Sequence, residues 1–209
     1  MSKSRIAALL ASAALSTVGV AHAAPTITPA YEYTSAGTLS DSRPFTLGFD
    51  FSLSNAVTVN ALGYTTVDFV TAQDVGIWDS LGNLIVSALV DPTDPVTGHF
   101  AWHGIASTLL SAGTYTIGGT YQTGQFPSYA SGLTNIPEYT WLRDQQLYGP
   151  GLNQPTATYG GYGLNGIPQV NFSVGGAVPE PATWGMMVAG VAAIGATMRR
   201  RQKVTVSYA

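Results

Sequence analysis

The chain has 209 residues, a formal net charge of −3 and no cysteine. The absence of cysteine excludes disulfide bonds, thioether attachment of haem and thiol catalysis. Six of the eight lysines and arginines lie near the two ends of the chain. The segment from Ala24 to Val178 therefore has only Arg43 and Arg143 against ten acidic residues, a net charge of −8. Such an acidic segment argues against nucleic acid and other polyanions as partners.

The first 23 residues have the pattern of a secretory signal peptide. Lys3 and Arg5 form a basic start, residues 6–20 are apolar, and a small-x-small sequence follows. We expect export through the Sec translocon and cleavage after residue 23. The residues of the expected cleavage site are Ala21, Ala23 and Ala24.

The body of the chain, residues 24–174, has the alternation of β-strands. Apolar and polar residues alternate strictly over 45–53, and a turn sequence at 79–83 separates two apolar segments as in a hairpin. A last strand is expected at 170–174, and no long amphipathic helical pattern interrupts the series. The pattern predicts an all-β fold: an antiparallel, jelly-roll-like β-sandwich of roughly eight or nine strands. A signal-peptide helix and a C-terminal transmembrane helix are expected to flank it.

Part of the body resembles a β-sandwich domain of undefined function that occurs in bacterial surface proteins. The resemblance rests on the segments 61–64, 75–85 and 110–118, which read ALGY, VGIWDSLGNLI and LSAGTYTIG. It implies a fold and a location at the cell surface, and it implies no catalytic residue.

Two places could hold a metal ion. Asp91 and Asp94, in the sequence DPTDP, could offer oxygen ligands to calcium, although Asp-Pro pairs also form turns. His99 and His103 lie four positions apart, which in a strand separates their Cα atoms by roughly 13 Å, too far for joint ligation. We expect no cofactor other than a weak calcium site.

The sequence predicts that the protein is not an enzyme. It contains no Gly-x-Ser-x-Gly elbow, zincin helix or phosphate-binding loop. Spacing alone does not place Asp68, Asp74 or Glu138 as the paired carboxylates of a glycosidase.

Aromatic residues are frequent between Tyr121 and Tyr162, among glycine, proline and amide residues with little regular alternation. The segment is expected to form long loops, which often carry function. Exposed rings beside amide side chains could stack on sugars, whereas the alternative is that the rings cover the open end of the sandwich. The candidate carbohydrate-binding residues are Tyr129, Tyr139, Trp141, Tyr148, Tyr159 and Tyr162.

Residues 175–209 have the arrangement of a membrane-associated sorting tail. A short linker leads to a Pro-Glu-Pro sequence, an apolar segment at about 182–198 follows, and a basic cluster comes next. The apolar segment is expected to be a short transmembrane helix, and the basic end is expected to stay in the cytoplasm by the positive-inside rule. The residues that define the arrangement are Pro179, Glu180, Pro181, Trp184, Arg199, Arg200 and Arg201.

This tail resembles the PEP-CTERM sorting signal of Gram-negative bacteria in its PEPxxWA variant, with Gly185 in place of the usual alanine. The resemblance implies recognition by an exosortase, and delivery from an inner-membrane-anchored precursor to the outer envelope or extracellular matrix. The predicted function is a structural or adhesive role associated with exopolysaccharide or biofilm. The alternative is a carbohydrate-binding module that uses the aromatic segment 121–162 with the assistance of calcium.

Overall fold

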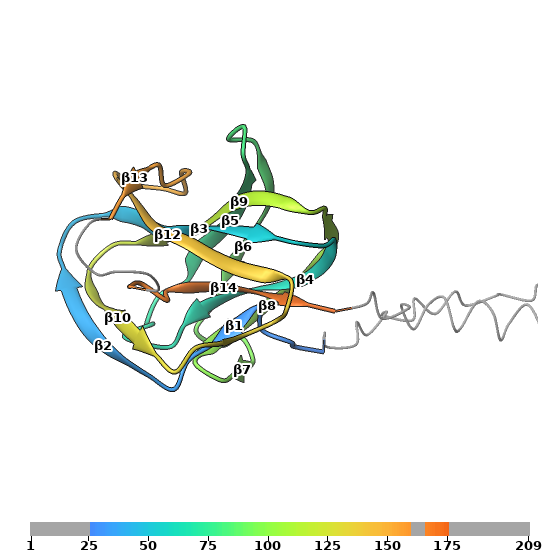
Figure 1. The fold of residues 1–209 in the computed structure, drawn as a ribbon. Helices are drawn as coiled ribbons and strands as arrows, with labels where there is room; N and C mark the ends of the chain where they lie inside the picture. The colour runs from blue at the N-terminus through green and yellow to red at the C-terminus, as the bar shows by residue number, and fades with distance from the viewer. Residues whose placement is uncertain (1–25, 160–165, 176–209) are drawn as a thin grey trace, which may run out of the picture. The chain divides into compact units, whose positions relative to one another are not determined.

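The computed structural model describes residues 26–159 and 166–175, and both stretches belong to one compact unit of the chain. Within them every regular element is a β-strand and every strand pairing is antiparallel (Figure 1). The prediction of an all-β fold is confirmed. The signal peptide, its cleavage site and the apolar segment 182–198 lie outside the described residues. Among the residues that are described, there is no helix with the length and hydropathy needed to cross a membrane.

Fourteen strands make up the described part of the chain, more than the eight or nine expected. Four of them contain only two residues, and such short pairings leave no alternation to detect in a sequence. The strands are β1 (Tyr31–Glu32), β2 (Ser35–Asp41), β3 (Phe45–Leu53), β4 (Val57–Thr65), β5 (Gln73–Asp79), β6 (Leu84–Val90), β7 (Val96–Thr97), β8 (Phe100–Leu110), β9 (Gly113–Tyr121), β10 (Gly124–Ser131), β11 (Thr134–Asn135), β12 (Tyr139–Tyr148), β13 (Ala157–Thr158) and β14 (Val170–Val174).

Two larger sheets carry most of these strands. The first has the order β13-β12-β3-β9-β5-β6 and the second the order β14-β4-β8-β7. The chain crosses from one sheet to the other between β3 and β4, β4 and β5, β6 and β7, β8 and β9, and β13 and β14. Two small pairings, β1 with β11 and β2 with β10, complete the fold, and β2 and β10 run together along one side of Figure 1.

The expected hairpin at 79–83 and the expected last strand at 170–174 are confirmed. β5 and β6 pair on either side of the turn, which Asp79 closes by accepting hydrogen bonds from the backbone nitrogens of Leu81 and Asn83, each at 2.9 Å. Gly82 in this turn has a φ of 88°, a conformation that glycine adopts without steric cost. Local turn chemistry therefore fixed this element.

The core between the two larger sheets is rich in aromatic rings, and Tyr31 lies within it with no exposed surface. Its ring centroid is 5.2 Å from that of Trp141, 5.7 Å from that of Phe49 and 5.6 Å from that of Phe100. Its hydroxyl donates to the carbonyl oxygen of Val170 at 2.7 Å. β1 is thus fastened to strands from both larger sheets, although it contains only two residues.

The first described residues run beside the last strand. The backbone nitrogen of Ala30 donates to Phe172 O at 2.8 Å, and that of Val174 donates to Thr28 O at 2.9 Å. These bonds cover the free edge of β14, and they hold the beginning of the body against its end.

β3 departs from the expected pattern of one buried and one solvated face. Its apolar residues face the core, but Thr46 and Asp50 on the opposite face are only 1% and 6% exposed. The segment Gly149–Thr156 covers this outer face: Thr46 Oγ1 donates to Gly151 O at 3.2 Å and accepts from the backbone nitrogen of Asn153 at 3.3 Å. Alternation alone could not reveal this cover, because the covering residues are about 100 positions away in the chain.

The expectation of long loops over 121–162 was wrong. β10 and β12 occupy 18 residues of this segment, and β12 pairs with β3 along its whole length. The polar residues Gln145 and Gln146 hide the alternation of β12, because they are accommodated in buried or half-buried positions of the sheet. Tertiary burial therefore overrode the low strand propensity of the sequence.

Candidate functional site

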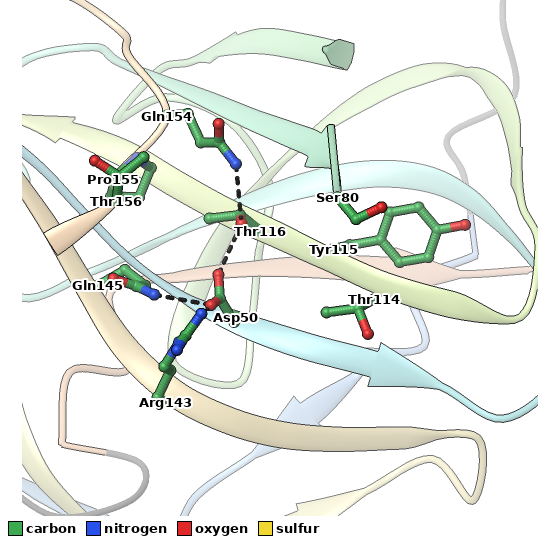
Figure 2. A pocket seen from close by; sticks show the side chains of 10 residues that line it. All are labelled: Asp50, Ser80, Thr114, Tyr115, Thr116, Arg143, Gln145, Gln154, Pro155 and Thr156. Atoms are coloured by element: carbon green, nitrogen blue, oxygen red, sulfur yellow. Dashed lines mark hydrogen bonds and ion pairs between the residues drawn. The ribbon is translucent and has the colours of Figure 1, made fainter. Parts of the chain in front are cut away.

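A polar hollow of about 240 Å³ lies on the outer face of the six-stranded sheet (Figure 2). Its floor is formed by side chains of β3, β9 and β12, and its walls are formed by the covering segment and by the β5–β6 turn. The residues that line it are Asp50, Ser80, Thr114, Tyr115, Thr116, Arg143, Gln145, Gln154, Pro155 and Thr156.

A β-bulge at Leu142 aims the β12 side chains into the hollow. Trp141 pairs with Phe51 and Arg143 pairs with Asp50, so that Leu142 is the extra residue on its strand. Directly opposed residues of an antiparallel pair point to the same face. Trp141 therefore faces the core with Phe51, whereas Arg143 joins Asp50 on the outer face. Bulges commonly redirect a side chain in this way.

Asp50 is the centre of the hydrogen-bond network in the hollow. Its Oδ1 accepts from Thr116 Oγ1 at 2.7 Å, and its Oδ2 accepts from Arg143 Nε at 2.7 Å and from Gln145 Nε2 at 2.8 Å. Gln154 Nε2 in turn donates to Thr116 Oγ1 at 3.3 Å, which extends the network to the covering segment (Figure 2). The buried carboxylate is thus compensated by one charged and two neutral donors, as a buried charge requires.

The covering segment approaches the sheet closely at Gly118. A Cβ atom at this position would lie 3.0 Å from Pro155 Cδ and 2.9 Å from Thr46 Cγ2. Only a residue without a side chain lets Pro155, which lines the hollow, rest on β9.

The hollow offers hydrogen-bond donors and acceptors in a compact space. The Arg143 side chain is 61% exposed, so its terminal nitrogens face solvent while its Nε is held by Asp50. Gln145 is only 3% exposed, and its Oε1 has no hydrogen-bond partner among the described residues. The Tyr115 ring, by contrast, stacks on Phe51 of the core, with a centroid distance of 5.6 Å. Such a set can hold a polar ligand that carries several hydroxyl groups or a carboxylate.

The six aromatic residues expected to bind sugar do not form one surface. Tyr139 and Trp141 are 3% and 8% exposed, and both belong to the aromatic core. This corrects the expectation that they present open faces: they occupy core-facing positions of β12. Tyr129 and Tyr148 are 53% and 49% exposed, the half-buried Tyr159 packs beside the small cluster of Phe45 and Leu47, and Tyr162 lies outside the described residues.

The two candidate calcium ligands are occupied by contacts within their own part of the fold. Asp91 Oδ1 accepts from the backbone nitrogen and hydroxyl of Thr93, at 2.8 and 2.6 Å. Asp94 Oδ2 accepts from the Asp91 backbone nitrogen at 2.8 Å and lies 3.0 Å from His103 Nδ1. Over residues 26–159 and 166–175, no three His, Cys, Asp or Glu side chains gather in a way that could hold a metal ion.

The two histidines contact different carboxylates. His99 Nδ1 lies 2.6 Å from Glu32 Oε1, and the His99 ring stacks on Tyr33, whereas His103 contacts Asp94. The fold thus gives each histidine its own acidic partner and does not bring the two histidines to a common ligand.

A second buried carboxyl belongs to Asp144, on the core side of β12. Its oxygens accept from Trp141 Nε1 at 3.1 Å and from the backbone nitrogen of Gly166 at 2.9 Å. Burial raises the pKa of Asp144 to about 6, although these donors act in the opposite direction. Asp144 joins β12 to the segment that precedes β14, and it does not face the hollow.

Sequence reasoning missed the residues of the hollow. One signal was available: Arg143 is one of only two basic residues in the body, so it had to lie near some of the ten acidic residues. The pairing of Arg143 with Asp50 depends on the bulge at Leu142, and no local sequence pattern predicts that bulge.

Comparison with known proteins identifies the tail. Residues 177–202 match the family model described as the PEP-CTERM protein-sorting motif. No curated protein and no solved structure matches the chain significantly. The chain therefore carries a PEP-CTERM protein-sorting motif, as predicted. The motif implies an exported protein that is processed by an exosortase and sorted to the cell surface.

Proposed function

We propose that the protein is a non-enzymatic component of the outer envelope or extracellular matrix, with a structural or adhesive role associated with exopolysaccharide. The body is a jelly-roll-like β-sandwich in this proposal. It passes through the Sec translocon, is held by the apolar segment 182–198 as an inner-membrane precursor, and is then sorted by the exosortase.

The observation that carries this proposal is the position of the sorting motif next to the folded body. β14 ends at Val174, and the matched motif begins at residue 177. A fully extended chain from Gly175 to Pro179 spans at most about 14 Å. Processing near the Pro-Glu-Pro sequence would therefore leave the whole sheet structure intact on the released protein.

The chemistry of the hollow supports a role without catalysis. Asp50 is the one carboxylate among its lining residues, and three hydrogen bonds already engage it. Acid–base hydrolysis of a glycoside needs two carboxyl groups across a cleft, so these lining residues do not supply that pair.

The test is the intact mass of the protein recovered from culture supernatant and from membranes of its native host. We expect a product that begins at Ala24 and ends near residues 179–181. A product that retains Ala209 at the cell surface would overturn processing by exosortase. Deletion of residues 179–209 should abolish surface delivery while export continues, and normal delivery of the deleted form would overturn sorting by the tail.

A second candidate function is carbohydrate binding at the hollow. The observation that favours it is the exposed guanidinium of Arg143 in a hollow that Ser80, Thr114 and Thr156 also line, since a sugar hydroxyl could accept a hydrogen bond from it. In this second proposal the ligand binds away from the aromatic residues of 121–162 that the sequence suggested.

Glycan binding separates the two candidates. The mature protein should bind polysaccharide from its own host, and Gln154→Ala should weaken binding by roughly tenfold if one or two hydrogen bonds are lost. Asn55→Ala is the matched control, because Asn55 is exposed and does not line the hollow. Absence of binding by the wild-type protein removes the second candidate and leaves the structural role.

A further inference from the structure

The edges of the two larger sheets differ in their protection. Residues 28–30 cover the edge of β14, whereas β13 and β7, of two residues each, pair with only Gln145 and Gln146 of β12 and with Phe100 and Ala101 of β8. β6 is an edge of seven residues that pairs, within the described part of the chain, with β5 alone. Natural proteins usually blunt a long edge strand with charges, proline or a covering segment.

β6 has few such protections. Its sequence, LIVSALV, contains no charged residue and no proline. Leu84, Ile85 and Leu89 are 50%, 37% and 53% exposed. A bulge at Ile85 interrupts the pairing of β6 with β5 near the start of β6, but residues 86–90 pair regularly. An edge strand has a row of backbone N–H and C=O groups without partners. Only another extended strand can form hydrogen bonds with all of them at once.

We propose that β6 pairs antiparallel with β6 of a second copy of this chain, around a two-fold axis at Ser87. The two six-stranded sheets then continue across the interface. Isologous pairing is the geometry expected of a symmetric dimer, in which the same surface serves both partners.

The charges around β6 permit a second copy to pair in this register. With Ser87 opposite Ser87, Asp91 of one copy lies opposite Asn83 of the other, so no two acidic residues are directly opposed.

The packing on the inner face is also self-complementary. Val86 and Ala88 face the core but are only half-buried, because β6 is the last strand of its sheet. In the proposed register Val86 of one copy lies opposite Ala88 of the other, and each copy therefore covers the open end of the other's core.

Single cysteines test the register, because the chain has none of its own. Directly opposed residues have Cα atoms about 5 Å apart, which a disulfide can bridge. Ser87→Cys in the full-length chain, purified in mild detergent, should form a covalent dimer under gentle oxidation, roughly tenfold faster than Ser111→Cys. Ser111 is an exposed serine outside β6, so this control measures collisions and any association through the tail. Equal rates for the two variants would overturn the proposal.

A second position distinguishes this register from others. The two copies of Leu89 would lie about 14 Å apart along the paired strands, too far for a disulfide. Leu89→Cys should therefore cross-link no faster than Ser111→Cys, and rapid cross-linking would overturn the register.

A charge at the two-fold axis tests the dimer itself. Ser87→Lys places two lysines directly opposite each other, whereas Ser111→Lys does not. Sedimentation of the full-length chains should show a dimer for wild type and Ser111→Lys, and a monomer for Ser87→Lys that keeps the circular-dichroism spectrum of the folded chain. A wild-type chain that sediments as a monomer would overturn the proposal.

Discussion

Arg143 Nε on β12 and Asp50 Oδ2 on β3 lie 2.7 Å apart, directly opposite each other in the strand pairing, because Leu142 bulges out of β12. If the pairing ran on regularly from Trp141 without the bulge, Leu142 would oppose Asp50. The bulge thus decides that the only two oppositely charged side chains lining the hollow meet on its floor.

The two partners of this pair should contribute unequally to stability. Asp50→Ala leaves the buried donors of Thr116 and Gln145 without their acceptor, and we expect a loss of about 3 kcal/mol in the free energy of unfolding. Arg143→Ala removes a side chain that is mostly exposed and leaves Asp50 with two donors, so its loss should be near 1 kcal/mol. Urea unfolding of both variants is the measurement. Equal losses would show that the network is not organised around the carboxylate.

Asp144 should make stability depend on pH in a defined window. Burial raises its pKa from 3.8 to about 6, so the native state binds more protons than the unfolded state between these values. Stability should therefore fall as pH rises from about 4 to about 6, by up to roughly 3 kcal/mol from this group. Unfolding of the wild type and Asp144→Asn at half-unit steps of pH is the measurement, and the variant should lack this decline.

Asp41 supplies the control for that experiment. The side chain of Arg43 lowers the pKa of Asp41 to about 2, which gives the opposite sign in a different window. The contribution of Asp41 is present above pH 4 and is lost as pH falls towards 2. Asp41→Asn should thus leave the profile between pH 4 and 6 unchanged. A flattened profile in that variant would contradict the assignment to Asp144.

Two buried tyrosines should respond differently to loss of the hydroxyl. Tyr31→Phe removes the bond to Val170 O and leaves that carbonyl unpaired, at a cost of about 1–2 kcal/mol. The Tyr139 hydroxyl has no partner among the described residues, so Tyr139→Phe should be neutral or slightly stabilising. Thermal unfolding of the two variants compares rings of the same core. A larger loss of stability for Tyr139→Phe than for Tyr31→Phe would contradict the inference that, of these two hydroxyls, only that of Tyr31 forms a hydrogen bond.

Gly118→Ala should disturb the covering segment. The new methyl group would meet Pro155 and Thr46 at about 3 Å, and such overpacking costs about 1–3 kcal/mol. Gly37→Ala is the matched control, because its methyl group would find ordinary contacts of 3.5 Å or more in β2. Faster hydrogen exchange at residues 151–156 in the Gly118 variant alone is the expected result. Unchanged exchange would mean that the segment does not rest on β9.

The sequence by itself determined the elements whose information is local. The alternation over β3, the turn that closes the β5–β6 hairpin and the last strand before Gly175 all follow from side chains within a few positions of one another. The sorting motif is local too, since an exosortase substrate is recognised by the order of a short segment.

Only the tertiary structure decided which polar face is solvated and which aromatic rings are exposed. Thr46 and Asp50 are buried by a segment about 100 residues further along, and Tyr139 and Trp141 enter the core because the pairing of β12 with β3 places them opposite Leu53 and Phe51. The single extra residue Leu142 shifts the alternation of β12 by one position. Every later β12 residue therefore points to the opposite face of the sheet from the one it would otherwise have. Burial depends on contacts between distant parts of the chain, and for that reason the hollow became visible only when those parts were brought together.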